Sequence, residues 1–248
     1  MSAAETPSRV LVTVCTYNER ENISRLIPEI RQHLPIAHVM VVDDNSPDGT
    51  ADVVRQFASN DPQVHLLLRM QKAGLGAATI AGFQQGVNEG YDFLINMDAD
   101  FSHPPAVLPQ MLAAMETADV AIGSRYVPGG GVSNWGLSRQ FMSWGVNVYS
   151  RTLLGLTPKD CSGAYRCYRV SKLQELDFSK IRAKGYAFQE EFLYRCARVG
   201  CRFAEVPILF ENRVAGESKI NSGEALKALR DIALLACDRI RGVSVRAS

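Results

Sequence analysis

Short apolar runs alternate with segments of helical spacing through the first 124 residues, and this alternation limits the fold more than any other feature. The apolar runs, which predict strands, are 10–15, 39–42, 64–68, 92–97 and 119–123. The segments that predict helices are 22–34, 51–58, 77–88 and 105–116. Because strands alternate with helices, we expect an α/β fold with a mainly parallel sheet and helices on its faces.

The second half of the chain is less regular. Helices are predicted at 137–154, 186–199 and 224–240, and further strands begin within 160–166 and 201–210. Pro207 in the last strand indicates a sheet edge or a bulge. No linker or repeat divides the chain. We therefore expect a single catalytic domain over residues 9–222, a disordered tail at 1–8, and an amphipathic helix and tail without a transmembrane segment at 223–248.

Composition excludes several classes of protein. The formal net charge of +1 gives no sign of a general nucleic-acid binder. The polar N-terminus does not resemble a signal peptide, and the apolar run 232–237 is far shorter than the roughly 20 residues that span a bilayer. The six cysteines form no CxxC pair, and the four histidines are scattered. These features predict a cytoplasmic protein with reduced thiols and no structural zinc.

Asp98 and Asp100 follow the fourth predicted strand. Two carboxylates one residue apart need a partner or a cation to offset their desolvation, and their oxygens suit a divalent metal bound to a diphosphate. A polar turn that caps the next helix is the alternative. The carboxyl ends of parallel strands share one edge of the sheet, so we expect the other polar clusters nearby.

Two of those clusters have acidic or glycine-rich character. Asp43 and Asp44 follow the second strand and suit hydrogen-bond donors on a nucleoside. Lys72 stands beside Gly74 and Gly76, which would allow close approach of a phosphate. The same glycines also suit an ordinary helix start.

Several cations and one helix face complete the candidates. Arg125, Arg139, Arg213 and Lys219 would supply local positive charge to phosphorylated substrates, although an average arginine is a solvated surface residue. Arg139, Ser143 and Asn147 share one helix face by their spacing. No Ser-His-Asp or Cys-His set is evident. A phosphate acceptor needs no strong general base, because it is already largely ionised at pH 7.

Eight short motifs in a fixed order carry a family resemblance. They are 16–19, 43–50, 72–76, 97–100, 123–126, 160–166, 186–190 and 213–219. This ordered set resembles the dolichyl-phosphate (polyprenyl-phosphate) mannosyltransferase family of inverting GT-A glycosyltransferases. The resemblance runs from about residue 9 to residue 240 and implies a GT-A fold, the fold of nucleotide-diphospho-sugar transferases.

The resemblance also implies substrates and site residues. It implies GDP-mannose as donor, a dolichyl or polyprenyl phosphate as acceptor, and Mg²⁺ or Mn²⁺ as cofactor. Asp98 and Asp100 would hold the metal. The implied catalytic residues are Asp100, Arg125, Arg139 and Ser143, the last two at the acceptor phosphate. Together with Lys72, the implied nucleotide-sugar residues are Cys15, Tyr17, Glu19, Val42, Asp44, Asp98, Ala99, Asp100, Arg125, Arg213 and Lys219.

The chain departs from the family pattern in three respects. Cys15 stands where proline is frequent. Ser102 stands where some relatives have glutamine, which leaves a third side-chain metal ligand open. Some relatives have C-terminal transmembrane helices, which this sequence does not show. Contact with the cytoplasmic face of a membrane would then come through the lipid acceptor, through a membrane-anchoring partner subunit, or through arginines of the last helix and tail, namely Arg230, Arg239, Arg241 and Arg246. Alternatively, that helix packs on the sheet.

Two other functions stay open. A glucosyltransferase that uses UDP-glucose and the same lipid acceptor would have the same fold. A non-catalytic subunit that presents lipid phosphate to a partner would have no use for the acidic pair. A dinucleotide-dependent enzyme is disfavoured, because no GxGxxG follows the first strand.

Overall fold

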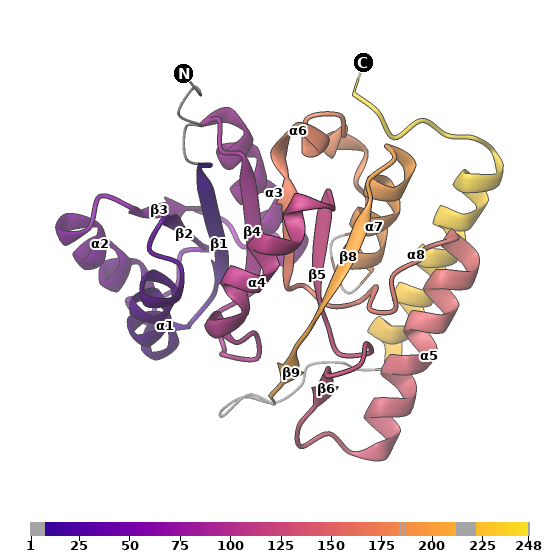
Figure 1. The fold of residues 1–248 in the computed structure, drawn as a ribbon, viewed down its shortest axis with the longest axis horizontal. Helices are drawn as coiled ribbons and strands as arrows, with labels where there is room; N and C mark the ends of the chain where they lie inside the picture. Colours follow the sequence, from indigo (N-terminus) through magenta and orange to yellow (C-terminus); the bar gives the residue numbers. More distant parts are fainter. Residues whose placement is uncertain (1–7, 184, 186, 212–221, 248) are drawn as a thin grey trace, which may run out of the picture.

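The computed structural model describes residues 8–183, 185, 187–211 and 222–247 (Figure 1). The strands are β1 Val10–Thr16, β2 Ala37–Asp43, β3 Val64–Leu68, β4 Phe93–Asp98, β5 Val120–Ser124, β6 Gly131–Val132, β7 Arg166–Arg169, β8 Phe203–Pro207 and β9 Leu209–Phe210. The α-helices are α1 Arg20–His33, α2 Thr50–Asn60, α3 Leu75–Asn88, α4 Leu108–Ala113, α5 Leu137–Leu154, α6 Val170–Leu173, α7 Phe188–Arg198 and α8 Ser222–Ile240. Short 3₁₀ turns are η1 Pro105–Val107, η2 Ala114–Glu116 and η3 Phe178–Lys180.

The main sheet has the order β3-β2-β1-β4-β7-β5-β8. β7 runs antiparallel to both of its neighbours, and the other pairs are parallel. This confirms the predicted single α/β domain with a mainly parallel sheet. The strand order reverses between β1 and β4. Ligands of such sheets bind outside the carboxyl ends of the strands at this reversal, which is where Cys15 lies opposite Asp98 in the register.

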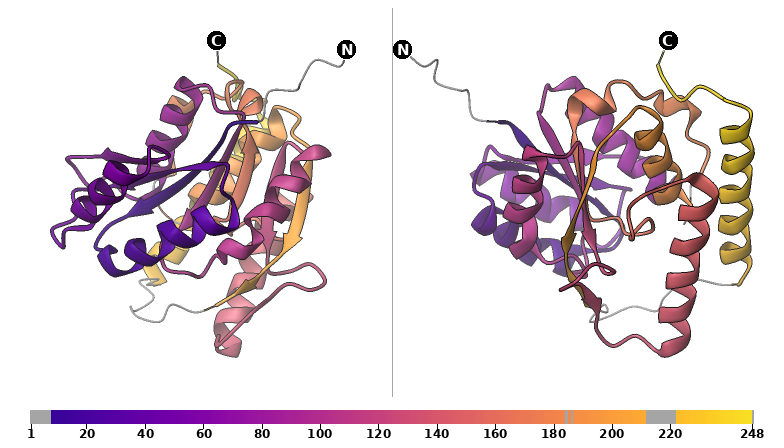
Figure 2. Two further views of the ribbon diagram at one scale, coloured as in Figure 1. Left: turned by 60° about the vertical axis from the view of Figure 1, so that its left-hand side comes forward. Right: turned by 45° about the vertical axis from the view of Figure 1, so that its right-hand side comes forward.

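Alternating side chains of the strands build a core on each face of the sheet. Val10, Val12 and Val14 of β1 pack in one cluster with buried residues of α1, α2 and α4. Leu11 of the same strand joins a second cluster, with Leu94 and the apolar faces of α3, α7 and α8. Period-2 alternation in a strand buried on both sides explains this division. Figure 2 shows the helices on the two faces of the sheet.

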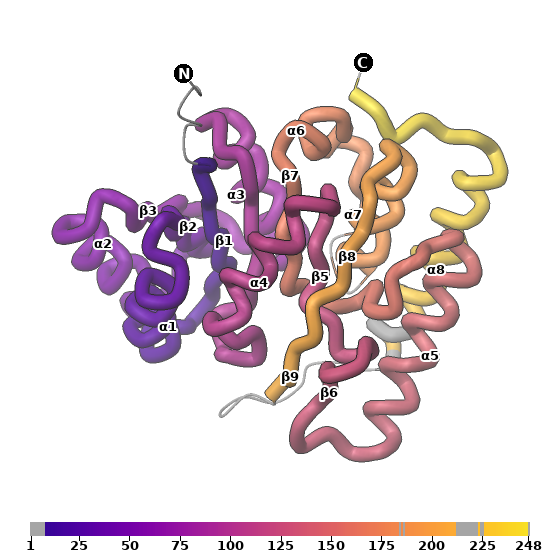
Figure 3. Tube along the Cα trace, viewed as in Figure 1, coloured from indigo at the N-terminus to yellow at the C-terminus, as the bar shows by residue number. Residues whose placement is uncertain are grey.

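α5 and α8 lie side by side at the end of the molecule farthest from α2 (Figure 3). α8 buries Ile232 and Leu235 in the core, and the Arg239 guanidinium donates to the Leu153 carbonyl of α5 at 3.0 Å. Of the two alternatives for this helix, packing on the protein is therefore the one that the structure shows. Within the described residues, we find no helix with both the length and the apolar character needed to cross a lipid bilayer.

Three segments differ from the sequence expectation. Residues 160–165 form a turn and not the start of a strand, because their N–H groups donate to the side chains of Asp160 and Asn147. The strand predicted at 201–210 is two strands, since β8 ends at Pro207, which has no N–H for a sheet bond. The helix at 105–116 is broken into α4 between two 3₁₀ turns.

Two helical glycines test how closely α3 packs on the sheet. A Cβ added at Gly86 would lie 2.4 Å from Leu94 Cδ2, whereas one added at Gly145 of α5 would meet no atom within 4 Å. We expect Gly86→Ala to lower the free energy of unfolding by about 1–2 kcal/mol, because overpacking outweighs the gain in helix propensity. Gly145→Ala should raise it by up to about 1 kcal/mol. Urea unfolding of both variants checks the opposite signs, and equal shifts would contradict the packing of α3.

Candidate functional site

The polar clusters predicted at separate strand ends come together at the carboxyl edge of the sheet. The Lys72 ammonium lies 3.4 Å from the centroid of the Tyr17 ring. Cys15 Sγ lies 3.6 Å from Thr79 Oγ1 of α3. The end of β1 is therefore beside the glycine-containing segment that leads into α3. The expected proximity of these segments is confirmed.

The buried His103 contacts both the backbone and the carboxylate of Asp98. The backbone N–H of Asp98 donates to His103 Nδ1 at 2.9 Å, and His103 Nε2 lies 3.9 Å from Asp98 Oδ2. Burial lowers the pKa of His103, although Asp98 and Asp100 oppose this shift. In a neutral ring whose Nδ1 accepts, the proton is on Nε2, which faces the Asp98 carboxylate. The imidazole also stacks on Tyr165, with ring centroids 5.0 Å apart.

Asp100 is oriented by the turn that follows it. Its Oδ1 accepts hydrogen bonds from the Ser102 N–H at 3.1 Å and from the Ser102 hydroxyl at 2.6 Å. Ser102 is 1% exposed, so its hydroxyl is committed to Asp100 and not to the edge of the sheet. Asp98 has 28% of its side chain exposed. Together these contacts set two carboxylates at the end of β4.

The acidic pair fits a divalent cation, since carboxylate oxygens are the ligands that Mg²⁺ and Mn²⁺ prefer. In the part of the chain that the structure describes, no group of three or more His, Cys, Asp or Glu side chains could hold a metal. A cation at Asp98 and Asp100 would therefore need oxygens from a ligand or from water. A bound diphosphate supplies such oxygens.

The nucleotide residues expected on β2 have different environments. The Asp44 carboxylate is 6% exposed and pairs with Arg69 at 2.7 Å. Burial raises the pKa of Asp44, and Arg69 counteracts this shift. Val42 is fully buried and packs under α3. The expected contact of Val42 with a nucleotide stays a prediction.

Asp43 holds its own turn together, and the nucleoside contact expected for it stays a prediction. It is fully buried, and its oxygens accept from the Thr16 hydroxyl at 2.8 Å and from the Ser46 N–H and hydroxyl at 2.9 and 2.6 Å. Glu19 lies beside this turn. Its carboxylate accepts a hydrogen bond from Asn22 Nδ2 at 2.6 Å, and its backbone N–H donates to Thr50 Oγ1. Ala99 is buried between the two metal candidates.

Arg125 and Asp160 form a buried ion pair at the end of β5. The guanidinium donates from Nε at 2.7 Å and from Nη2 at 2.6 Å to the two carboxylate oxygens. Their side chains are 8% and 0% exposed. Burial alone would raise the pKa of Asp160, but Arg125 and backbone N–H groups hold that pKa below its ordinary value. Nη2 also donates to the Ser162 hydroxyl at 2.8 Å.

The predicted face of α5 meets this ion pair. Asn147 Oδ1 accepts from the N–H groups of Cys161 and Ser162 at 2.7 and 3.2 Å. Ser143 Oγ accepts from the Tyr126 hydroxyl at 2.7 Å. The Arg139 guanidinium lies over Trp135, 4.0 Å from the ring centroid. The structure thus brings Arg125, Arg139 and Ser143 to one end of α5.

Two predicted residues, Arg213 and Lys219, lie outside the described residues. Sequence reasoning missed the parts of His103, Asp160 and Tyr126. Asp160 belongs to the motif 160–166, and its place in that motif, beside Cys161 and Gly163, is the sequence feature that marks it as a functional candidate. Its pairing with a residue 35 positions earlier has no periodic signature in the sequence.

Replacing Asp160 tests the buried ion pair. We expect Asp160→Asn to lower the free energy of unfolding at neutral pH by about 3 kcal/mol, because Arg125 loses its counter-charge. Because the folded-state pKa of Asp160 is lowered, its stabilisation is complete above the unfolded-chain pKa of about 3.9. This stabilisation is lost as pH falls through the folded-state value. Urea unfolding of wild type and variant should therefore differ less near about pH 3.

The matched control is Asp52→Asn. Asp52 and its partner Arg55 have 80% and 54% of their side chains exposed. Because exposed pairs contribute little, we expect a change within about 0.5 kcal/mol at any pH. An Asp160→Asn protein as stable as wild type at neutral pH would contradict the assignment of Asp160 as the anchor of Arg125.

Comparisons with known proteins show the family to which the chain belongs. The family model described as "Glycosyl transferase family 2" matches residues 11–177. Undecaprenyl-phosphate mannosyltransferase of Micrococcus luteus is 48% identical over 215 residues, which cover 87% of this chain and 88% of that protein. Polyprenol monophosphomannose synthase of Mycolicibacterium smegmatis is 44% identical over 241 residues, covering 95% and 91%. These relatives confirm the family resemblance of the ordered motifs.

A solved structure shares the fold. Glucosyl-3-phosphoglycerate synthase of Mycobacterium tuberculosis, in complex with Mn²⁺, UDP and glucosyl-3-phosphoglycerate, superimposes with a TM-score of 0.66. The match covers 96% of this chain and 81% of that one, at 17% sequence identity. At that identity the likeness concerns the fold alone, and it agrees with the GT-A fold expected from the motifs.

Proposed function

Because the chain belongs to glycosyl transferase family 2, we propose that it transfers mannose from GDP-mannose to the phosphate of a polyprenyl phosphate, with inversion at the anomeric carbon. The two relatives at 44–48% identity carry this proposal, since both are named for mannosylation of a polyprenyl phosphate or polyprenol. The site supports it, because one sheet edge brings together an acidic pair and a set of cations on α5 and the end of β5. A reaction between two phosphorylated substrates requires both.

The reaction needs no proton transfer from the acceptor. An oxygen of the acceptor phosphate attacks the anomeric carbon, the bond from that carbon to the diphosphate oxygen breaks, and GDP leaves with the electron pair. A phosphate monoester is already largely ionised at pH 7. This agrees with the absence of an obvious general base among the residues that we place at the acceptor.

Arg125 and Ser143 have the geometry to hold that phosphate. Asp160 takes Nε and Nη2 of Arg125, so Nη1 of the planar guanidinium points away from Asp160. Ser143 accepts from Tyr126, which leaves its own hydroxyl proton to donate. With Arg139 on the same helix, these donors would position the phosphate for in-line attack. A cation on Asp98 and Asp100 would neutralise charge on the leaving diphosphate.

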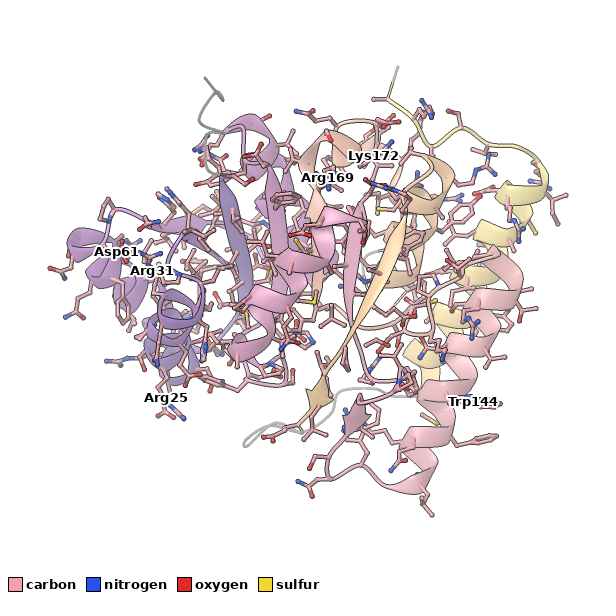
Figure 4. All side chains as sticks on the ribbon, viewed as in Figure 1. Arg25, Arg31, Asp61, Trp144, Arg169 and Lys172 are labelled. Atoms are coloured by element: carbon pink, nitrogen blue, oxygen red, sulfur yellow. The ribbon has the colours of Figure 1, made fainter. Side chains whose placement is uncertain are left out.

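An exposed apolar stripe on α5 supports a lipid acceptor. Leu137, Phe141, Trp144 and Val148 recur at helical spacing, and their exposed fractions run from 38% to 84%. Figure 4 shows Trp144 pointing away from the protein at the outer side of α5. Ser143 and Arg139 lie on the same helix. Peripheral contact with a membrane through this stripe would bring the lipid phosphate to the site.

The decisive experiment measures transfer of labelled mannose from GDP-mannose to a short polyprenyl phosphate, with UDP-glucose as the rival donor. We expect product with GDP-mannose and its loss on addition of EDTA. Asp100→Asn should slow transfer by about 100-fold or more, in the range for loss of one group that stabilises transition-state charge. Asp52→Asn serves as the surface control. Transfer from UDP-glucose but not from GDP-mannose would indicate a glucosyltransferase. No transfer from either donor would favour a non-catalytic lipid-phosphate-binding subunit.

The apolar stripe gives a separate prediction. We expect the double variant Phe141→Ser/Trp144→Ser to bind vesicles that contain polyprenyl phosphate at least about tenfold more weakly than the wild type. The reason is that the variant has no aromatic side chains at these two positions to transfer from water into the membrane. Transfer to a short, water-soluble acceptor should stay near the wild-type rate.

Leu226→Ser/Ile240→Ser on α8 is the matched control, since these side chains are 69% and 86% exposed. This control should bind vesicles like the wild type. Equal loss of vesicle binding in both double variants would contradict a membrane contact specific to α5.

A further inference from the structure

Two adjacent buried side chains at the first turn of α7, and Arg166 of the neighbouring strand β7, each have an atom without a hydrogen-bond partner. Among the described residues, six buried side-chain atoms lack a partner, and three of them are Arg166 Nε, Gln189 Nε2 and Glu190 Oε2. The side chains belong to residues that are 0%, 7% and 2% exposed. Such groups are costly to bury unpaired. The donor of Gln189 and the acceptor of Glu190, on adjacent residues, therefore suit a ligand that has both kinds of group.

The first turn of α7 lies between the glycine-containing segment that leads into α3 and the turn that begins with Asp160. A Cβ added at Gly76, at the start of α3, would lie 2.7 Å from Phe188 Cδ2 and 3.3 Å from the Ala183 carbonyl oxygen. On the other side, the Arg166 guanidinium donates to the carbonyl oxygens of Gln189 at 2.7 Å and Cys161 at 2.6 Å. The turn that begins with Asp160 is thereby tied to α7.

The sheet register places the same groups near the acidic pair. Arg166 of β7 is the partner of Asn96 in β4, and Asn96 precedes Asp98 by two residues on the same face of the strand. That face is the one covered by α3 and α7, as the shared core of Leu94, Phe83 and Phe192 shows. Gln189 and Glu190 therefore belong to the donor side of the sheet edge.

Glu190 is not simply the counter-ion of Arg166. No ion pair or hydrogen bond joins these two side chains in the described part of the chain, although each has an unpartnered atom. Burial raises the pKa of Glu190 to about 7, with opposing effects from Arg166 and Arg125. The unpartnered oxygen of this buried carboxyl group can accept a hydrogen bond from a neutral hydroxyl of a ligand.

We propose that the side chains of Gln189 and Glu190 bind hydroxyl groups of the transferred hexose and so set the preference for its sugar. A hydroxyl donates one hydrogen bond and accepts others, so it can pair with Glu190 Oε2 and Gln189 Nε2 at once. This inference rests on the proposed function, since it takes the bound ligand to be a nucleotide sugar. A site built to bond a particular hydroxyl rejects donors that lack it, because its own polar groups then stay unpaired.

The test measures binding of GDP and of GDP-mannose, each with Mg²⁺, to wild type, Glu190→Gln and Gln189→Met. We expect both variants to bind GDP like the wild type and to bind GDP-mannose about 10- to 100-fold more weakly, the range for a hydrogen bond to a charged or buried polar group. In a series of GDP-mannose analogues that each lack one sugar hydroxyl, one analogue should bind the wild type weakly, and Glu190→Gln should weaken it no further.

Tyr194→Phe is the matched control. Its hydroxyl is another buried atom of α7 without a partner, but it lies one helical turn farther along α7, where it lines a pocket with Asp238 and Val245. It should bind both ligands like the wild type. Thermal unfolding identifies a variant that does not fold, and Gln189→Met, which carries no change of charge, then decides the outcome.

Three outcomes would overturn the inference. Equal weakening of GDP and GDP-mannose would assign Gln189 and Glu190 a structural part only. Unchanged binding of every donor would indicate that buried water satisfies these groups. If wild type binds neither GDP nor GDP-mannose, the proposed function itself fails, and the inference fails with it.

Discussion

The turn that begins with the buried Asp160 ties β5, β8 and α5 together. The Asp160 carboxylate fixes Arg125 at the end of β5 through two guanidinium hydrogen bonds and the Arg125 N–H. It accepts the N–H of Gly163, and Glu205 of β8 in turn accepts the N–H of Asp160. Asn147 of α5 holds the next two residues. A charge pair removed from water is stable only when its hydrogen bonds are complete, so these segments keep one another in place.

This network explains how a nearly neutral protein concentrates charge at one edge of its sheet. Arg125 keeps its positive charge under burial because Asp160 raises its pKa against the effect of desolvation. At the end of β4, a neutral His103 supports Asp98 without adding a charge. Arg125 and Asp98 are thus each held in place by a buried neighbouring side chain. For the proposed reaction, such a preorganised site would let charge develop on the phosphate with little rearrangement of the protein.

Residues of similar chemistry make different contacts in the folded protein. Asp43 and Asp44 are adjacent, yet Asp43 ties down its own turn while Asp44 pairs with Arg69. Apolar stripes differ in the same way. The stripe of α8 reaches the core with Ile232 and Leu235, whereas Phe141 and Trp144 of α5 lie exposed. Spacing predicts that a stripe exists, but only the neighbouring elements decide what covers it.

The sequence by itself determined the α/β class, most strands and helices of the first half, and the polar residue types at the strand ends. These follow from local periodicity, which is set by the backbone geometry of a strand or a helix. The tertiary structure alone decided that β7 runs antiparallel between β4 and β5, that Val42 is buried, and that Asp160 anchors Arg125. Those outcomes depend on which segments become neighbours in space, and pairing across tens of residues leaves no period in the sequence.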